Sequence, residues 1–454
     1  MLKSINPYNN ELIGEFKQLK VEDIDKNLNL AQRGFTAWRN TGFDERGKFL
    51  RDLASILKKD RDEYAGLISR ETGKVVKESK KEVDKSAMVL EYFSEHAEGF
   101  LGERKTKADE GEGLIRYEPM GVILAIMPWN YPFWQLFRFA ATTLMAGNAI
   151  LLKHSSDVPA CSEKINEIFE KACFPGGVFQ NLIVPSSGIN NIIKDFRVQA
   201  VSLTGSIAAG SDVAGNAGRH IKKVVLELGG SDPFIVLEDA DIKKAAKSGV
   251  KSRMKNFGQS CDAAKRFILH QSIADEFLEE FIKELETWKF GDPLDENSDY
   301  ASLVNTDQKN LLSRQIDESL EKGAKIHWQD TKAPEGGAFF NPVIIKDIPP
   351  LTPAYKDELF GPAASVFVVD DGFEAVRIAN DTDYGLGASV WTGDFERGLK
   401  MTYEIQAGII YINDEVHSRP QLPFGGVKKS GIGREMAGEG SREFTNKKSL
   451  WYNL

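Results

Sequence analysis

Short apolar segments alternate with segments of helical pattern over most of this chain, and the alternation strongly constrains its fold. Between residues 113 and 229 the strand-like segments are GLIRYEPMGVILAIMPW, AILLK, NLIVP, AVSLTG and KKVVLEL, with helix-like FWQLFRFAATTLMAG and PACSEKINEIFEKAC between them. A second block begins near Pro233, with the strand-like segments FIVL, RFILH, ASVFVV, ASVWTG and GIIYIN. Strands that alternate with helices are typical of βαβ units and parallel sheets. We therefore predict an α/β fold with two α/β domains.

The two ends of the chain follow other patterns. After a short strand-like start, residues 22–100 interleave charged and apolar positions at helical spacing and predict helices. The last stretch, REFTNKKSLWYNL, predicts a terminal strand with exposed aromatic residues. An edge strand of this kind commonly pairs with another strand, and a second subunit is one candidate partner.

Charge and cysteine content exclude several classes of function. The 454 residues carry a formal net charge of -9, which disfavours binding to nucleic acid. The three cysteines (Cys161, Cys173 and Cys261) form no CxxC pair, a pattern typical of a reduced, cytoplasmic protein. The start of the chain lacks the apolar core of a signal peptide, and no apolar run of about 18 residues predicts a membrane helix. The six histidines show no close metal-ligand spacing, so we expect no metal site.

Two loops are candidates for ligand binding, because parallel sheets bind ligands beyond the carboxyl ends of their strands. In VSLTGSIAAGSDVAG (201–215), Thr204-Gly205-Ser206 opens a helix whose free N–H groups suit an anion. The spacing is not GxGxxG, and a plain strand-to-helix turn explains it equally well. In AILLKHSSDVP (149–159), Lys153 and the following serines suit an adenosine ribose or its 2′-phosphate. A helix N-cap at Ser155, Ser156 or Asp157 is the alternative there.

Four further segments carry side chains that suit one chemistry. MPWNYP contains Asn130, VLELGG contains Glu227, FGQSC contains Cys261, and YKDELFGP contains Glu358 and Phe360. Each has a structural alternative when taken alone. A lone cysteine is usually a small core side chain, and a Glu before a diglycine is usually part of a turn.

Taken together and in order, MPWNYP, LLKHSSD, LTGSIAAG, LELGG, GQSC, ELFGP and LPFGGVKKSGIGRE resemble the NAD(P)-dependent aldehyde dehydrogenase superfamily. The resemblance runs from about residue 5 to the end of the chain. It implies a Rossmann-type NAD(P)-binding domain (1–100 and 121–229) and an α/β catalytic domain (230–430). It also implies a small β oligomerisation arm (101–120 and 435–454), whose hairpin joins the C-terminal strand of a neighbouring subunit in a homodimer or homotetramer.

The resemblance also implies roles for the catalytic residues. Cys261 matches the nucleophile, whose thiolate attacks the aldehyde carbon to form a thiohemiacetal. Asn130 matches the donor that stabilises the oxyanion together with the Cys261 backbone N–H. Hydride transfer to the nicotinamide then leaves a thioester, and Glu227 matches the base that activates water to hydrolyse it.

On the cofactor side, Lys153 matches the ribose-binding lysine, and Glu358 matches the carboxylate that holds the nicotinamide ribose, with Phe360 against the ring. The remaining cofactor positions implied by the resemblance are Trp129, Thr204, Gly205, Ser206 and Leu228. NAD-preferring members usually have a glutamate where Ser156 stands here. The missing negative charge makes room for a 2′-phosphate, so we predict NADP as the preferred cofactor and NAD as the weaker one.

Three residues point to the substrate. Arg138, eight residues after Asn130, lies where the family lines its substrate entrance, and an arginine there suits a carboxylate. Lys255 and Ser418 fall where succinate-semialdehyde dehydrogenases supply a basic residue and a hydroxyl, so we expect oxidation of succinic semialdehyde to succinate. A surface or inter-subunit salt bridge for Arg138 and a solvated Lys255 are the alternatives.

A broad-range dehydrogenase of short aliphatic or aromatic aldehydes is the second hypothesis, favoured by Phe133 and Trp134 near the entrance. A non-oxidative thiol hydrolase or an NADP-binding structural protein is disfavoured, because the nucleophile, base, oxyanion-donor and cofactor positions are all filled.

Two departures from the family pattern concern the catalytic centre. Phe139 replaces a lysine linked to proton relay, which leaves Glu435 as a candidate second carboxylate. Asp262 follows the nucleophile where an uncharged residue is common, and its charge raises the thiol pKa if it faces the sulfur. We expect it to point away, toward Lys265 or Arg266. Ala263 excludes a disulfide switch of the kind that some members form with a second cysteine at this position.

Overall fold

The computed structural model describes residues 1–107 and 111–452. The chain begins with an antiparallel hairpin of β1 (Leu2–Ile5) and β2 (Leu12–Phe16). The helices α1 (Val21–Trp38), α2 (Phe43–Lys59), α3 (Arg61–Thr72) and α4 (Val76–Leu101) follow. The helical pattern predicted for residues 22–100 is therefore confirmed.

The first sheet contains six strands in the order β17-β9-β8-β5-β6-β7. Its parallel strands are β5 (Val122–Met127), β6 (Ala149–His154), β7 (Phe179–Asn181), β8 (Val198–Thr204) and β9 (Lys223–Glu227). The short β17 (Gly431–Ile432) returns antiparallel to β9. The connecting helices are α5 (Trp134–Met145), α6 (Pro159–Lys171), α7 (Ile189–Lys194) and α8 (Ile207–Arg219). The segment NLIVP contributes only Asn181 to a strand, because the pairing of β7 with β6 ends there.

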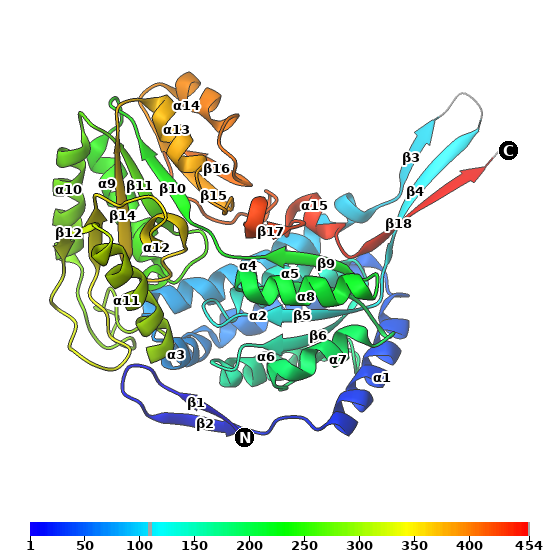
Figure 1. Cartoon of the computed structure of the whole chain (residues 1–454). Coiled ribbons are helices and arrows are strands. Elements are labelled where there is room, and N and C mark those ends of the chain that lie inside the picture. The colour runs from blue at the N-terminus through cyan, green and yellow to red at the C-terminus, as the bar shows by residue number, and fades with distance from the viewer. Residues whose placement is uncertain (108–110, 453–454) are drawn as a thin grey trace.

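The second sheet has the order β12-β13-β14-β11-β10-β15-β16, and only β12 is antiparallel to its neighbour. Its strands are β10 (Asp232–Val236), β11 (Ala264–His270), β12 (Lys325–Gln329), β13 (Val343–Lys346), β14 (Ala363–Val369), β15 (Gly387–Trp391) and β16 (Ile409–Ile412). Its helices are α9 (Ile242–Met254), α10 (Ala274–Thr287), α11 (Thr306–Glu321), α12 (Pro353–Lys356), α13 (Gly372–Asn380) and α14 (Phe395–Thr402). This block stands beside the block built on the first sheet (Figure 1), which confirms the predicted α/β class.

The strand order of the first sheet decides where a ligand site lies. The chain leaves β5 for β6 on one side and later returns with β8 on the other side. In open parallel sheets such a reversal leaves a crevice at the carboxyl ends of the strands. The segments that follow β5, β6, β8 and β9 carry Asn130, Ser156, Gly205 and Leu228 at this edge.

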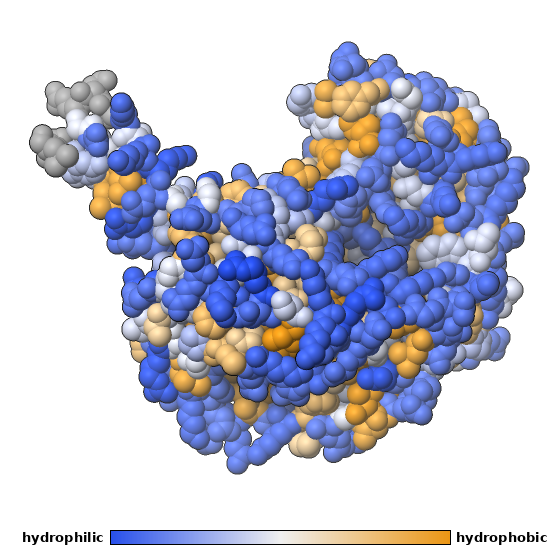
Figure 2. All heavy atoms as spheres, turned by 180° about the vertical axis from the view of Figure 1, so that it is seen from behind, coloured by the Kyte–Doolittle hydropathy of each residue, from blue (hydrophilic) through white to orange (hydrophobic). Residues whose placement is uncertain are grey.

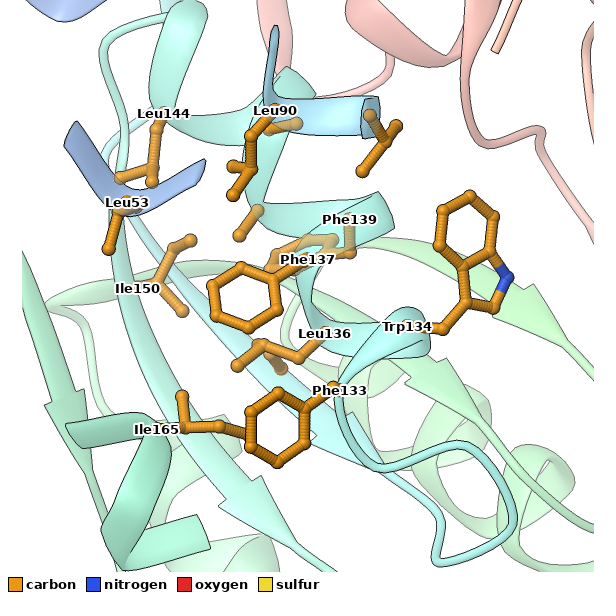
Figure 3. Close-up of a cluster of buried hydrophobic side chains, with 14 of the residues drawn as sticks. Leu53, Leu90, Phe133, Trp134, Leu136, Phe137, Phe139, Leu144, Ile150 and Ile165 are labelled. Carbon is orange, nitrogen blue, oxygen red and sulfur yellow. The ribbon is translucent and has the colours of Figure 1, made fainter. Parts of the chain in front are cut away.

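Helix α5 is the centre of the core beneath that edge. All twelve of its residues are buried, because the first sheet covers one side of it and α2 and α4 cover the other. Figure 3 shows Phe137 and Leu136 of α5 among Leu53, Leu90 and Ile150 from the surrounding elements. Each large apolar side chain buried here stabilises the fold by about 1.5–3 kcal/mol. The site that begins at the start of α5 therefore rests on a rigid support.

A three-stranded arm extends from the body of the molecule (Figure 1) and is formed by β3 (Arg104–Lys107), β4 (Glu112–Pro119) and β18 (Thr445–Tyr452). The expectation that the hairpin joins the terminal strand of a neighbouring subunit is wrong. Strand β18 pairs with β4 of its own chain over eight residue pairs, from Thr445 with Pro119 to Tyr452 with Glu112. Residues 108–110 and 453–454 of the predicted arm lie outside the described residues.

The C-terminal part of the arm begins later than the predicted residue 435. Glu435 is buried, and α15 (Ala437–Ser441) packs against α4, so these residues belong to the body of the molecule. In the space-filling view of Figure 2 the arm stands out from a face that hydrophilic residues mostly cover. Over residues 1–107 and 111–452 no helix combines the length and apolar character that crossing a bilayer requires.

Candidate active site

Two cavities meet at Cys261. The larger cavity, of about 400 Å³, lies over the carboxyl edge of the first sheet, and the charged cavity, of about 190 Å³, lies over α4 and α5. Cys261 and Gln135 line both. A thiol at this junction can be reached by one molecule from each side.

The loop that carries Cys261 has an unusual backbone. Asn256, Phe257 and Gly258 all have positive φ angles (47°, 53° and 78°); the left-handed region suits glycine, tolerates asparagine and disfavours the bulky Phe257. A side chain at position 258 would clash, because its Cβ would lie 2.3 Å from the Gly361 carbonyl. Buried Arg253 holds the turn by donating to the Gly258 carbonyl at 2.7 Å. The local strain therefore sits immediately before the nucleophile and is locked by tertiary contacts.

Lys265 holds the loop from the other side. Its ammonium donates to the carbonyl oxygens of Ser260 and Cys261, each at 2.7 Å, and pairs with Glu358 at 3.1 Å. One buried cation thus connects the thiol loop to the carboxylate predicted to hold the nicotinamide ribose. The sequence had suggested Lys265 only as a partner of Asp262, and this link to the cofactor side was missed, although its position four residues after the cysteine was a usable signal.

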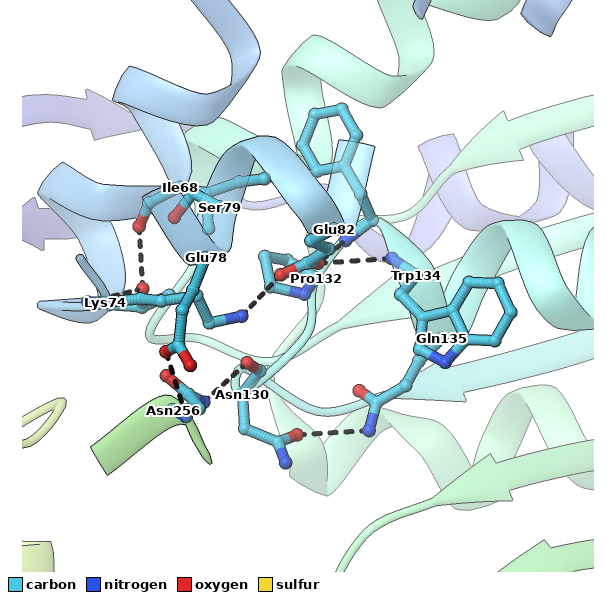
Figure 4. A network of polar contacts seen from close by, with 12 residues as sticks. Ile68, Lys74, Glu78, Ser79, Glu82, Asn130, Pro132, Trp134, Gln135 and Asn256 are labelled. Atoms are coloured by element: carbon cyan, nitrogen blue, oxygen red, sulfur yellow. Dashed lines mark hydrogen bonds and ion pairs between the residues drawn. The ribbon is translucent and has the colours of Figure 1, made fainter. Parts of the chain in front are cut away.

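Asn130 is held in one orientation. Its Nδ2 donates to the Gln259 carbonyl at 3.0 Å, and its Oδ1 accepts from Gln135 Nε2 at 3.1 Å (Figure 4). Asn256 Nδ2 donates to the Asn130 carbonyl at 2.9 Å. Since an amide has two N–H donors, one remains for an oxygen atom in the larger cavity, which Asn130 lines. The predicted oxyanion donor is therefore preorganised.

Two carboxylates on α4 support this arrangement, and the sequence reasoning missed them. Glu82 Oε1 accepts from the backbone N–H groups of Phe133 and Trp134 at 2.9 and 3.2 Å, at the start of α5, and Lys74 pairs with Glu82 (Figure 4). Glu78 accepts from the Asn256 backbone N–H at 3.0 Å. Their spacing of four residues places both on one helix face, which was the available signal.

Glu227 ends β9 and lines the larger cavity, and its carboxylate oxygens have no hydrogen-bond partner among the described residues. Burial raises the pKa of this carboxyl well above its usual range, and the neighbouring Glu435 raises it further. Burial and the charge of Glu435 thus both make this carboxylate a stronger base than a solvent-exposed one. Gly425 lies against it, since a Cβ there would be 2.6 Å from Glu227 Oε1.

Arg138 lies at the end of the charged cavity and is fully buried. Its guanidinium pairs with buried Glu435 and lies 4.5 Å from the centroid of the Phe424 ring. The ion-pair alternative for Arg138 is thus realised, but inside the molecule rather than at its surface. Glu435, the candidate second carboxylate, is the partner.

The expected partners of Asp262 are wrong. Lys265 and Arg266 both bind backbone carbonyls, and Asp262 instead pairs with Lys255 at 3.1 Å and accepts from Ser260 Oγ at 2.6 Å. Burial opposes its charge most strongly, but Lys255, the Ser260 hydrogen bond and Lys85 together outweigh burial and hold the pKa of Asp262 at about 2. Burial raises the pKa of the Cys261 thiol, and Asp262 raises it further.

Lys153 and Ser156 line a third cavity, the lysine cavity, of about 230 Å³. The N-cap alternative for this loop does not hold, because α6 begins without a side-chain cap. Glu71 of α3 accepts instead from the Ala160 and Cys161 N–H groups at 2.8 and 2.7 Å. The Ser156 hydroxyl therefore has no capping role, and burial lowers the pKa of Lys153.

The other predicted cofactor residues come together around the larger cavity, whose lining includes Trp129, Thr204, Gly205, Ser206, Leu228, Glu358 and Phe360. Ser206 caps α8 by accepting from the Ala209 N–H at 3.3 Å. Phe360 packs edge-on against Trp129 with ring centroids 5.7 Å apart. A Cβ at Gly229 would lie 2.3 Å from Glu358 Oε2, so a side chain there would displace that carboxylate from its present position.

These residues fit a dinucleotide. The larger cavity offers a capped helix start, an aromatic wall and the Glu358 carboxylate, and the lysine cavity offers Lys153 at the same sheet edge. Lys153 and Ser156 would hold the adenosine end, and Glu358 with Phe360 would hold the nicotinamide end. When bound, a nicotinamide dinucleotide supplies a hydride acceptor.

A thiol, an amide donor and a buried carboxyl at the junction of two cavities are the groups that thiol-mediated aldehyde oxidation requires. The chain belongs to the aldehyde dehydrogenase family, whose sequence model matches residues 1–450. The family resemblance is thereby confirmed.

The similarity to known proteins extends over the whole chain. It is 43% identical over 450 residues to a Synechocystis sp. protein named "Probable succinate-semialdehyde dehydrogenase NADP(+)", covering 99% of each. It is 39% identical over 448 residues to "Succinate semialdehyde dehydrogenase NAD(P)+ Sad" of Escherichia coli, covering 99% of this chain and 97% of that protein. The structure of succinic semialdehyde dehydrogenase from Streptococcus pyogenes with NADP+ superposes with a TM-score of 0.97 at 34% identity, covering 100% of both chains.

Proposed function

We propose that this protein oxidises succinic semialdehyde to succinate with NADP as the preferred hydride acceptor. The observation that carries the proposal is the charged cavity, which opens onto Cys261 and is lined by Arg138, Lys255 and Ser418. A short aldehyde with a distal carboxylate can place its carbonyl at the thiol and its negative charge among these groups. The relatives from Synechocystis sp. and Escherichia coli, both named succinate-semialdehyde dehydrogenases, support this substrate.

The proposed chemistry uses three residues of the chain. The Cys261 sulfur bonds to the aldehyde carbon, and the former carbonyl oxygen accepts from Asn130 Nδ2 and the Cys261 backbone N–H. Loss of hydride from that carbon leaves a thioester. Glu227 then takes a proton from water, which attacks the thioester carbon, and the thiol is released with the acid. Lys265 and Arg138 lower the pKa of the thiol and so oppose the effects of burial and Asp262.

The preference for NADP rests on the lysine cavity. Ser156 is exposed at its rim, and none of the described residues that line it is acidic. A 2′-phosphate therefore meets Lys153 without a repelling carboxylate. The names of the relatives from Synechocystis sp. (NADP(+)) and Escherichia coli (NAD(P)+) support NADP with NAD as the weaker cofactor.

The broad-range alternative has less support. Phe133, one of the two aromatic residues that favoured it, is fully buried in the core and does not line the charged cavity. Trp134 lines the cavity, but cations surround it. An apolar aldehyde would leave Lys85 without a counter-charge, whereas Arg138 is paired with Glu435.

The decisive experiment compares succinic semialdehyde with butanal, which has the same number of carbons and no carboxylate, using NADP and then NAD. We expect kcat/KM to be highest for succinic semialdehyde with NADP. Equal values for the two aldehydes would contradict the proposed substrate, and a higher value with NAD would contradict the proposed cofactor preference.

The proposal includes a homo-oligomeric assembly and a cytoplasmic location. The projecting arm supports the assembly, since its outer strands leave backbone groups that another chain can cover. The location is supported by the thiol chemistry, because Cys261 must stay reduced to act as a nucleophile.

A further inference from the structure

Lys85 of α4 lines the charged cavity, and neither the sequence motifs nor the family resemblance pointed to it. Its Nζ donates to Ser418 Oγ at 2.7 Å and lies 4.1 Å from the centroid of the Trp134 ring. Ser418 is the hydroxyl predicted to contact the substrate. Lys85 therefore lies within the expected binding site for the substrate carboxylate.

The two cations that the sequence predicted for this subsite already have carboxylate partners. Arg138 pairs with buried Glu435. Lys255 pairs with Asp262 at 3.1 Å and also donates to the Val416 carbonyl at 3.2 Å. Each of these charges is largely neutralised before a substrate arrives.

Lys85 differs from them in this respect. Within residues 1–107 and 111–452, no carboxylate oxygen lies within 4 Å of its Nζ. An ammonium has three donors, and only the one to Ser418 is used. The face of Trp134 attracts the cation but provides no acceptor oxygen.

We propose that Lys85, acting with Ser418, holds the distal carboxylate of the substrate and determines the preference for carboxylated aldehydes; this inference rests on the proposed function. Asp262 has a related role. By pairing with Lys255 it leaves Lys85 as a half-buried cation with unused donors, whereas Lys81 on the same helix is exposed, so that the carboxylate is directed to the Lys85 side of the cavity.

The charges around Lys85 come from every element that lines the cavity. Those on its own helix are Glu78, Lys81 and Glu82. Those from other elements are Arg138 of α5, Lys251 of α9, Lys255 and Asp262 of the nucleophile loop, and Glu415, which pairs with Lys251. Burial and the charge of Lys255 lower the pKa of Lys85, whereas Asp262 and Glu82 raise it. A substrate carboxylate would add the missing negative charge.

The test measures kcat/KM for succinic semialdehyde and for butanal, with NADP, in the wild type and in Lys85→Met. Loss of a charge-assisted hydrogen bond reduces binding on the order of 10- to 100-fold. We expect a decrease of that size for succinic semialdehyde, carried by KM, and little change for butanal. Lys85→Arg, which keeps the charge, is expected to retain part of the preference.

Lys48→Met is the matched control, because Lys48 is exposed on α2 and pairs only with Asp52 among the described residues. This control is expected to leave kcat/KM unchanged for both aldehydes. Activity on butanal also reports that each variant is folded, and Lys85→Gln provides a second neutral variant.

The outcomes separate the two proposals. A wild type without preference for succinic semialdehyde overturns both the proposed function and the role of Lys85. A wild type with that preference, retained in Lys85→Met, overturns only the role of Lys85. An equal decrease in kcat/KM for both aldehydes in Lys85→Met and Lys85→Gln also overturns the role of Lys85 in substrate preference, because such a decrease indicates a structural role.

Discussion

The larger cavity and the charged cavity meet at the same sulfur but are built by different means. Backbone loops at the sheet edge shape the larger cavity, with glycines at the points of closest approach. Among the described residues its lining includes Glu227, Asp357 and Glu358 but no lysine or arginine. Charged side chains shape the charged cavity, including Lys85 and Arg138 from helices and Lys255 and Asp262 from the nucleophile loop.

The comparison shows that motif residues identify a backbone-built site better than a side-chain-built one. Every cofactor residue predicted around the larger cavity lines it. In the charged cavity the predicted residues are also present, yet motif matching did not identify the partner of either cation: Arg138 pairs with Glu435 from a distant segment, and Lys255 pairs with Asp262 of its own loop. The free energy of a charged site depends on these partners, because an unpaired charge is costly to bury.

Replacement of the shared thiol should have the largest effect. Cys261→Ala removes the sulfur at which the two cavities meet, so we expect no NADPH formation above background with any aldehyde. NADP binding should persist, since the larger cavity is otherwise intact. Absorbance at the NADPH band measures NADPH formation, and equilibrium dialysis measures NADP binding. Residual turnover with succinic semialdehyde would exclude Cys261 as the nucleophile.

A substitution at the rim of the lysine cavity should alter the preference between NADP and NAD but not the preference between aldehydes. Ser156→Glu places a carboxylate near the 2′-phosphate, and we expect the ratio of kcat/KM with NADP to that with NAD to fall on the order of 100-fold. Ser156→Gln is the neutral control of the same size. An unchanged ratio in Ser156→Glu would contradict the proposed position of the phosphate.

The preference for a carboxylated substrate should depend on pH, because Lys85 in the charged cavity gains or loses its charge near neutral pH. Burial and the charge of Lys255 lower the pKa of Lys85 to about 7, so Lys85 is charged below pH 7 and neutral above it. The ratio of kcat/KM for succinic semialdehyde to that for butanal should therefore fall about tenfold between pH 6 and pH 8. Ionisation of Cys261 and Glu227 cancels in this ratio. Lys85→Met should give a flat ratio, and a flat wild-type ratio would contradict the assignment.

The smallest expected effect concerns the influence of Asp262, in the charged cavity, on the reactivity of the Cys261 thiol. Asp262→Asn removes a negative charge that raises the pKa of Cys261 and frees the positive charge of Lys255. Both changes favour the thiolate, so alkylation by iodoacetamide at pH 7 should be about fivefold faster. Glu415→Gln, in the same cavity but paired with Lys251, should leave the rate unchanged. A slower rate in Asp262→Asn would show that this charge does not act on the sulfur.

Local signals predicted much of the fold and of the candidate site. The alternation of apolar strands and helices predicted two α/β blocks, and the strand ends predicted ligand binding by the loops that carry Lys153 and Gly205. Predictions that depended on distant contacts were less accurate. Asp262 was assigned to its sequence neighbours Lys265 and Arg266, but these bind carbonyls and Asp262 pairs with Lys255. The terminal strand was assigned to another subunit, but its pattern shows only that it is a strand, and β4 of the same chain supplies the partner.

The sequence by itself determined the family, the α/β class and the identity of the groups that meet at Cys261, because each is encoded in a short motif with a fixed local geometry. The tertiary structure alone decided which charges are neutralised: Glu435 reaches Arg138, Asp262 reaches Lys255, and Lys85 is left facing Ser418. Electrostatic energies depend on distance and burial rather than on separation along the chain, so the balance of charge in the cavity emerges only when the helices and the loops are packed together.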